Sequence, residues 1–166
     1  MRIMTLAGIV STIVSLACGG SGGDANLTGV DSGASGAGDG GVTATINGTA
    51  WRSSKALDHA LRASANAQII TLSATNLPNS IAIAIGPISG PATLSMDTGN
   101  PSNAVVTMTV GSSTTIWSTA LTGGKGTVTV TTLTATRIAG TFSFDASSNA
   151  GAGTLQVRNG TFDLAF

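Results

Sequence analysis

The chain has 166 residues and no net formal charge, and only 8% of its residues are charged. It contains one histidine, one cysteine, seven acidic residues that are all aspartate, and no tyrosine. A neutral chain lacks the basic surface that nucleic-acid binding requires, so we expect no nucleic-acid partner. One cysteine excludes disulfides within the chain and multi-cysteine metal sites, and we predict neither a metal nor another cofactor.

Residues 3–17 form an apolar run behind Arg2, which carries the only side-chain charge before Asp24. A helix needs about 20 apolar residues to cross a bilayer, so this run is too short to be a typical membrane span. Its length matches the hydrophobic region of a secretory signal peptide. We therefore predict that residues 1–17 are a signal peptide.

The segment from Val14 to Gly19 resembles the lipobox of bacterial lipoproteins, with Ala17 directly before Cys18. The resemblance implies cleavage between Ala17 and Cys18, and lipid attachment to the Cys18 thiol. Two or more acyl chains anchor a protein stably, whereas one chain binds a membrane only marginally. Gly19 stands where aspartate would retain such a lipoprotein in the inner membrane, which favours the outer membrane. The alternative is an ordinary signal peptide, with Cys18 unmodified.

Residues 18–41 are predicted to form a flexible tether behind the lipid. Ten of the 23 residues from 19 to 41 are glycine, and only Leu27 and Val30 are large and apolar. Such a segment buries too little apolar surface to offset the entropy lost on ordering. We predict a single β domain beyond it, at residues 42–166.

Apolar residues alternate with polar ones through residues 42–166, and turn residues interrupt the pattern every eight to twelve positions. This predicts an all-β domain, an antiparallel two-sheet sandwich or flattened barrel of about nine or ten strands. In residues 127–131 threonine alternates with valine, which predicts a core face and a hydrated threonine face. The expected strands are 42–46, 49 onward, 68–75, 80–86, 92–96, 104–110, 114–120, 126–133, 135–145 and 154–166.

Two Asn-Gly pairs indicate special backbone. Asn47-Gly48 separates two expected strands and predicts a hairpin turn with positive φ. In the last strand the apolar residues at 155 and 157 are odd-numbered, whereas those at 162 and 164 are even-numbered. A β-bulge at Asn159-Gly160, with the glycine at positive φ, would return both sets to one face. A tight turn at the same place is the alternative.

Residues 51–64 have an ambiguous pattern. Trp51, Leu57 and Leu61 share one parity, as residues of a strand do, although a helical stripe also fits. We predict a long strand here, with a helical turn near Asp58 as the alternative.

Motifs spread over the chain resemble a family of small bacterial lipoproteins that is filed as a domain of unknown function. They are the sequences INGTAW at 46–51, GTFSFD at 140–145 and NGTFD at 159–163, after Cys18 and its glycine-rich tether. The resemblance covers essentially the whole mature chain. It implies a lipid-anchored β domain and brings no catalytic residues with it.

Few residues are candidates for chemistry. A Ser–His–Asp centre would have to use His59, beside Asp58, and the chain has no G-x-S-x-G elbow. Two oxygen-rich loops, at 97–103 and 145–149, are calcium candidates, with turn capping as the alternative. Trp51 and Trp117 are candidates for contacting a ligand, with core packing as the alternative.

We predict a lipid-anchored protein of the cell envelope, in the outer membrane, whose β domain is a non-enzymatic binding or structural module. Its expected partner is the membrane, through Cys18, and a protein or glycan partner stays open. One alternative is a lipocalin-like carrier of a small apolar ligand, with Trp51 and Trp117 near a barrel mouth. A second is a hydrolase that uses His59.

Overall fold

The computed structural model describes residues 39–62, 69–110, 112–148, 150–151 and 153–166. These residues form eleven antiparallel strands and one short 3-10 helix, so the predicted all-β class is confirmed. The predicted signal peptide, Cys18 and most of the tether lie outside the described residues. Within the described part, no helix has the length and apolar character to span a membrane. The elements are β1 Asp39–Ile46, β2 Thr49–Arg52, η1 Lys55–Leu57, β3 His59–Arg62, β4 Ile70–Asn76, β5 Asn79–Ile85, β6 Ala92–Ser95, β7 Asn103–Val110, β8 Ser113–Ser118, β9 Lys125–Leu133, β10 Arg137–Ser148 and β11 Thr154–Ala165.

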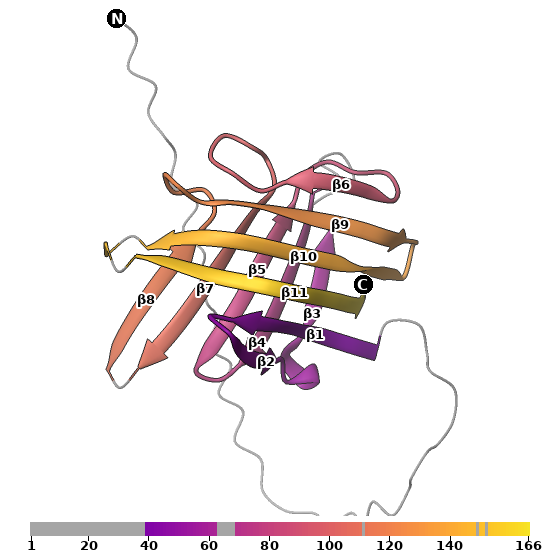
Figure 1. Cartoon of the computed structure of the whole chain (residues 1–166). Coiled ribbons are helices and arrows are strands. Elements are labelled where there is room, and N and C mark those ends of the chain that lie inside the picture. The colour runs from indigo at the N-terminus through magenta and orange to yellow at the C-terminus, as the bar shows by residue number, and fades with distance from the viewer. Residues whose placement is uncertain (1–38, 63–68, 111, 149, 152) are drawn as a thin grey trace, which may run out of the picture. The chain divides into compact units, whose positions relative to one another are not determined.

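The strands form one continuous sheet that bends back on itself into two layers (Figure 1). The front layer in Figure 1 has the order β2-β1-β11-β10-β9-β6, and the layer behind it has the order β8-β7-β5-β4-β3. β10 belongs to both, because its residues 138–145 pair with β9 whereas Ser147 and Ser148 pair with β8. The strands of the two layers cross steeply, as in orthogonally packed sheets. β2 and β3 end the sheet without pairing to each other.

The core fills the space between the two layers. Alternate residues of each strand point inward, so that Ile81, Ile83 and Ile85 of β5 are at most 2% exposed. Opposite them, Val128 and Phe144 of the front layer are at most 1% exposed. Burying each such side chain contributes roughly 2 kcal/mol to stability. The predicted alternation of core-facing and outward-facing residues is therefore observed in both layers.

The long strand predicted at 51–64 is wrong, because the chain breaks there into β2, η1 and β3. The alternative of a helical turn near Asp58 is correct. Leu57 and Leu61 are 46% and 58% exposed, and the buried residue of β3 is Ala60. Because the predicted single strand is two strands, β2 and β3, the domain has eleven strands where about nine or ten were predicted. The break lets one segment pair with β1 through β2 and with β4 through β3, at opposite ends of the sheet.

Hydrogen bonds and one cation–π contact connect the two ends of the sheet to neighbouring strands and turns. Ser53 N–H donates to the carbonyl of Val42 on β1, and Ser54 N–H donates to the carbonyl of Thr75 on β4. Arg62, the last residue of β3, stacks over the Phe166 ring at 4.1 Å. The Arg62 guanidinium also donates to the Thr134 carbonyl in the turn between β9 and β10. The open side of the sheet is therefore bridged by side chains and turns.

The hairpin and the bulge predicted at the two Asn-Gly pairs are both present. Asn47 and Gly48 have φ of 46° and 83° and connect β1 to β2. At the second pair, β11 shifts register against both of its neighbours, β10 and β1. As a result Leu155, Val157, Phe162 and Leu164 are all buried.

The residue at positive φ in the bulge is Asn159, with φ of 51°, so the prediction of positive φ at Gly160 is wrong. Glycine is needed at 160 for a different reason. A Cβ built there would lie 2.4 Å from the ring of Phe142, the residue opposite on β10. That ring stacks on Phe144 at 5.9 Å and on Phe162 at 6.4 Å between ring centroids. Phe142 therefore covers the glycine, and its neighbours hold the ring in place.

We expect Gly160→Val to lower the free energy of unfolding by about 2 kcal/mol, because the added side chain overpacks the Phe142 ring. Gly90→Val is the matched control, because Gly90 has open space where its Cβ would be and no positive φ. Urea denaturation measures both. If the positive φ of the bulge were the cause, adding Phe142→Leu to Gly160→Val would recover no stability. A clash with the ring predicts partial recovery.

Candidate functional site

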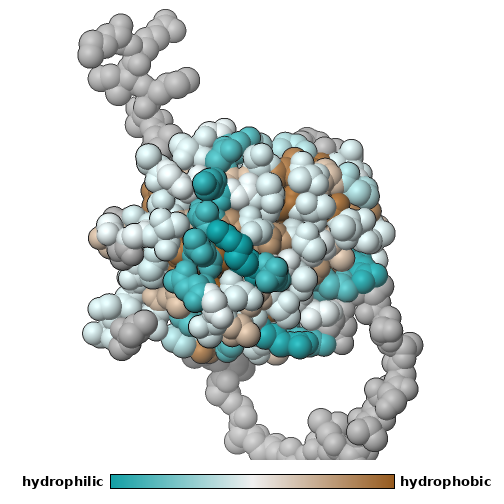
Figure 2. All heavy atoms as spheres, in the orientation of Figure 1, coloured by the Kyte–Doolittle hydropathy of each residue, from teal (hydrophilic) through white to brown (hydrophobic). Residues whose placement is uncertain are grey.

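A row of threonines crosses the outer face of the front layer. Neighbouring strands pair these residues directly, so each threonine lies opposite the next. All are exposed or half-buried, which agrees with the predicted hydrated threonine face. Figure 2 shows this face as mainly pale, the colour of intermediate hydropathy, with a teal hydrophilic streak across it. The threonine row consists of Thr93 on β6, Thr129 on β9, Thr141 on β10, Thr161 on β11 and Thr43 on β1.

Hydroxyl groups in the threonine row bond to each other across strands. The Oγ1 atoms of Thr43 and Thr161 are 2.8 Å apart, and those of Thr93 and Thr129 are 3.0 Å apart. Each pair has two hydroxyl hydrogens and uses one of them in the mutual bond. Each pair therefore keeps one hydrogen and several lone pairs for another molecule.

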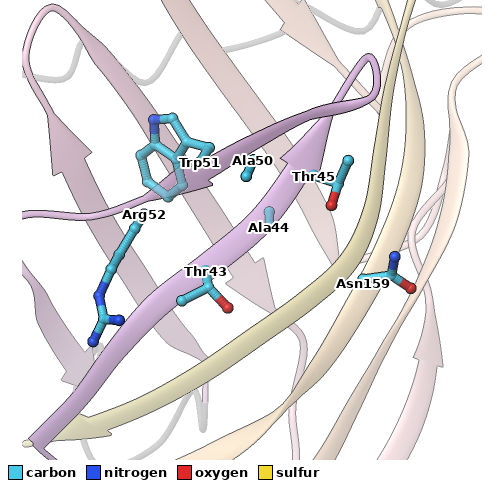
Figure 3. A pocket seen from close by; sticks show the side chains of 7 residues that line it. All are labelled: Thr43, Ala44, Thr45, Ala50, Trp51, Arg52 and Asn159. Carbon is cyan, nitrogen blue, oxygen red and sulfur yellow. The ribbon is translucent and has the colours of Figure 1, made fainter.

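Two hollows lie along the threonine row and meet at Asn159. One, of about 370 Å³, includes Thr43, Thr45 and Arg52 in its lining, and Figure 3 shows these residues with Asn159 on the neighbouring β11. The other, of about 400 Å³, is lined by Thr129, Thr141, Thr161 and their neighbours on β9, β10 and β11. We call the two together the outer groove. Because the bulge places Asn159 in both linings, the groove runs across strands from β9 to β2.

The charged residues of this face are mostly paired. The Arg158 guanidinium donates to the Asp145 carboxylate and, at 2.8 Å, to the Phe144 carbonyl. Arg137 and Asp163 form a two-point pair with distances of 2.7 and 2.6 Å. The hydrogen bonds that Arg137 donates to the Asp163 carboxylate raise the pKa of the guanidinium above its ordinary value, so it stays protonated. The face therefore presents hydroxyl and amide groups more than net charge.

The domain containing this groove matches one family model. The model, a domain of unknown function (DUF6252), aligns with residues 39–164. The chain belongs to the DUF6252 family. No curated protein and no solved structure matches it significantly. The coarse part of the predicted resemblance is thereby confirmed, since the family is one of unknown function.

The DUF6252 domain does not bring its two tryptophans together. Trp51, on the end strand β2, lies opposite Ala44 and packs against the core, and its Nε1 is buried without a hydrogen-bond partner. It also contributes to the lining of the smaller hollow. Trp117, on β8, lies opposite the buried Val106 and packs against the core from the back layer. Both hollows open on the outer face, away from the apolar space between the layers.

His59 is exposed and lines neither hollow of the outer groove. Its neighbour Asp58 has a structural role. The Asp58 carboxylate accepts hydrogen bonds from the Ser53 hydroxyl and, at 3.3 Å, from the Thr75 N–H. Ser53 Oγ in turn accepts a bond of 2.9 Å from the Val42 N–H. Asp58 therefore links the two ends of the sheet through Ser53.

The first oxygen-rich segment is a turn, whereas residues 145–148 of the second are the end of strand β10 and form no loop. The Asn100 amide donates to the Asp97 carboxylate, and the Asn100 N–H donates to the Asp97 carbonyl, as in a capped turn. In the second segment Asp145 pairs with Arg158, and Asn149 lies outside the described residues. No three His, Cys, Asp or Glu side chains come together as a metal site within the described ranges.

The outer groove and the roles of its polar residues Arg52 and Asn159 were not predicted from the sequence. Two signals were present. The alternation of threonine in 127–131 indicated the face, and the parity change at 159–160 indicated where it is interrupted. The strand register, which places one threonine on each of five strands in a single row, could not be read from these signals.

We expect Asp58→Ala to lower the free energy of unfolding by about 1 kcal/mol, because the Thr75 N–H loses its side-chain acceptor and the Ser53 hydroxyl keeps only the Val42 carbonyl, at 3.0 Å. His59→Ala, one residue away, is the control and should be nearly neutral. Chemical denaturation measures both variants. Equal stability of Asp58→Ala and the parent would contradict this role for the carboxylate.

Proposed function

We propose that this DUF6252 protein is a lipid-anchored protein of the cell envelope, held in the outer membrane through Cys18. Its β domain serves as a non-enzymatic binding module, and the outer groove is its binding surface. The observation that carries the binding role is the outer groove itself, an open surface on which hydroxyls recur from strand to strand.

The distribution of reactive groups supports binding without catalysis. General acid–base chemistry needs a titratable group within hydrogen-bond reach of the reacting atoms. In the linings of the two hollows, the ionisable side chains are Arg52 and Arg158, and Arg158 is bound to Asp145. Arginine stays protonated and does not act as a base. Binding through hydrogen bonds is the chemistry that this lining favours.

The anchoring role rests on the sequence. Cys18 stands where the apolar run ends and the glycine-rich segment begins, which is where a lipobox cysteine is expected. Several acyl chains on one residue give stable membrane attachment. The glycine-rich residues 19–38 would then separate the β domain from the lipid headgroups, leaving the outer groove accessible.

We expect Cys18→Ala to abolish incorporation of radioactive palmitate. The variant should also be absent from the membrane fraction that detergent extracts. The reason is that the only thiol of the chain is lost. Ser21→Ala, three residues further on, should keep both the label and the membrane location. Palmitate labelling that persists in Cys18→Ala would refute lipidation at this residue.

A further inference from the structure

We propose that the outer groove binds an extended, uncharged oligosaccharide that lies across the strands of the front layer. This inference rests on the proposed binding function and names the class of ligand. It derives from three features of the groove, namely its direction, its hydrogen-bonding groups and its charge.

The direction of the groove fits a chain molecule. The groove crosses β9, β10, β11, β1 and β2, and neighbouring strands lie about 4.8 Å apart, so it extends over roughly 19 Å. Polar groups recur at each strand along this path, because the threonine row is in register. A ligand that repeats hydroxyl groups along an extended backbone meets a repeating set of partners here. A compact small molecule would use only part of it.

The hydrogen-bonding groups fit hydroxyls. A threonine hydroxyl both donates and accepts, and the Asn159 amide offers two donors and an acceptor. Sugar hydroxyls have the same double character, so each contact can form in either direction. Each threonine also presents a methyl group beside its hydroxyl, which offers apolar contact to the C–H groups of a sugar ring. A ligand of acceptors only, such as a phosphate chain, would use the donors of these groups and leave their acceptor oxygens without partners.

The charges of the groove fit a neutral ligand. Arg158, which lines the larger hollow, is neutralised by Asp145. Asp163 neutralises Arg137 nearby, and both ion pairs join β10 to β11. Arg52 is exposed at the β2 end and is the one remaining charge among the lining residues of the two hollows. A polyanion needs a row of cations along its length, and the described part of this face does not present one.

The bulge gives the groove its centre. Asn159 is exposed at positive φ, and it is the residue common to the linings of both hollows. Without the bulge, the regular alternation of β11 would place the apolar residues before Asn159 and those after Gly160 on opposite faces of the sheet. The geometry thus places an amide midway along a row of hydroxyls, where it contacts a ligand that spans both hollows.

The test is isothermal titration calorimetry of the full chain, isolated from its own cells in detergent micelles. The probes are cellohexaose, fully N-acetylated chitohexaose, laminarihexaose and mannohexaose, which are uncharged and differ in sugar unit or linkage. We expect saturable binding of at least one of them. The double variant Thr129→Val/Thr161→Val keeps side-chain shape and removes two hydroxyls of the row, so its affinity should fall about tenfold.

The matched control is Thr109→Val/Thr114→Val. These two threonines on β7 and β8 form a similar hydroxyl pair, 3.0 Å apart, outside the outer groove. The control should bind within about twofold of the parent. Urea denaturation of both double variants establishes that each is folded before the titration.

Three results would overturn the inference. They are no saturable binding of any of the four probes, an equal loss of affinity in the control variant, and tighter, salt-sensitive binding of polygalacturonate than of the neutral probes. None of these results affects palmitate labelling of Cys18, so failure of the ligand class is distinguishable from failure of the anchor. Loss of labelling with retained oligosaccharide binding would leave the groove as proposed.

Discussion

The packing of Phe142 over Gly160 is the constraint on which the front layer depends. β11 is the strand between β10 and β1, and its two halves have opposite parity. Only the extra residue at the bulge lets both halves bury their apolar side chains. The bulge requires a residue without a side chain opposite Phe142, where a Cβ would lie 2.4 Å from the ring. The same feature brings Asn159 to the outer face, so core packing and groove geometry have one cause.

Most of the fold was predictable because its signals are local. Alternation identified the strands, and the parity change located the bulge. Which residue of the Asn-Gly pair takes positive φ was not predictable, because asparagine and glycine both tolerate that region. The steric reason for Gly160 depends on Phe142, which is 18 positions earlier in the sequence. A contact of that kind follows from register, and register follows from the assembled sheet.

The segment at 51–62 shows the opposite case, in which local alternation was misleading. Trp51, Leu57 and Leu61 share parity, yet two of the three are largely exposed. The local pattern was overridden by a buried hydroxyl, that of Ser53, which is 7% exposed and which the half-buried Asp58 reaches across the 3-10 turn. A buried hydroxyl needs its partners, and satisfying it turned the chain out of strand geometry. The same requirement joined the two ends of an open sheet.

Threonine explains why the outer face is polar without being charged. It favours the strand conformation and carries a hydroxyl, so it solvates the face while supporting the sheet. Apart from Arg52, the acidic and basic side chains near the groove neutralise each other, which weakens long-range attraction as a source of selectivity. Recognition at such a surface depends on hydrogen-bond geometry over several strands. It therefore depends on the register that the Asn159–Gly160 bulge fixes, and it should change little with ionic strength.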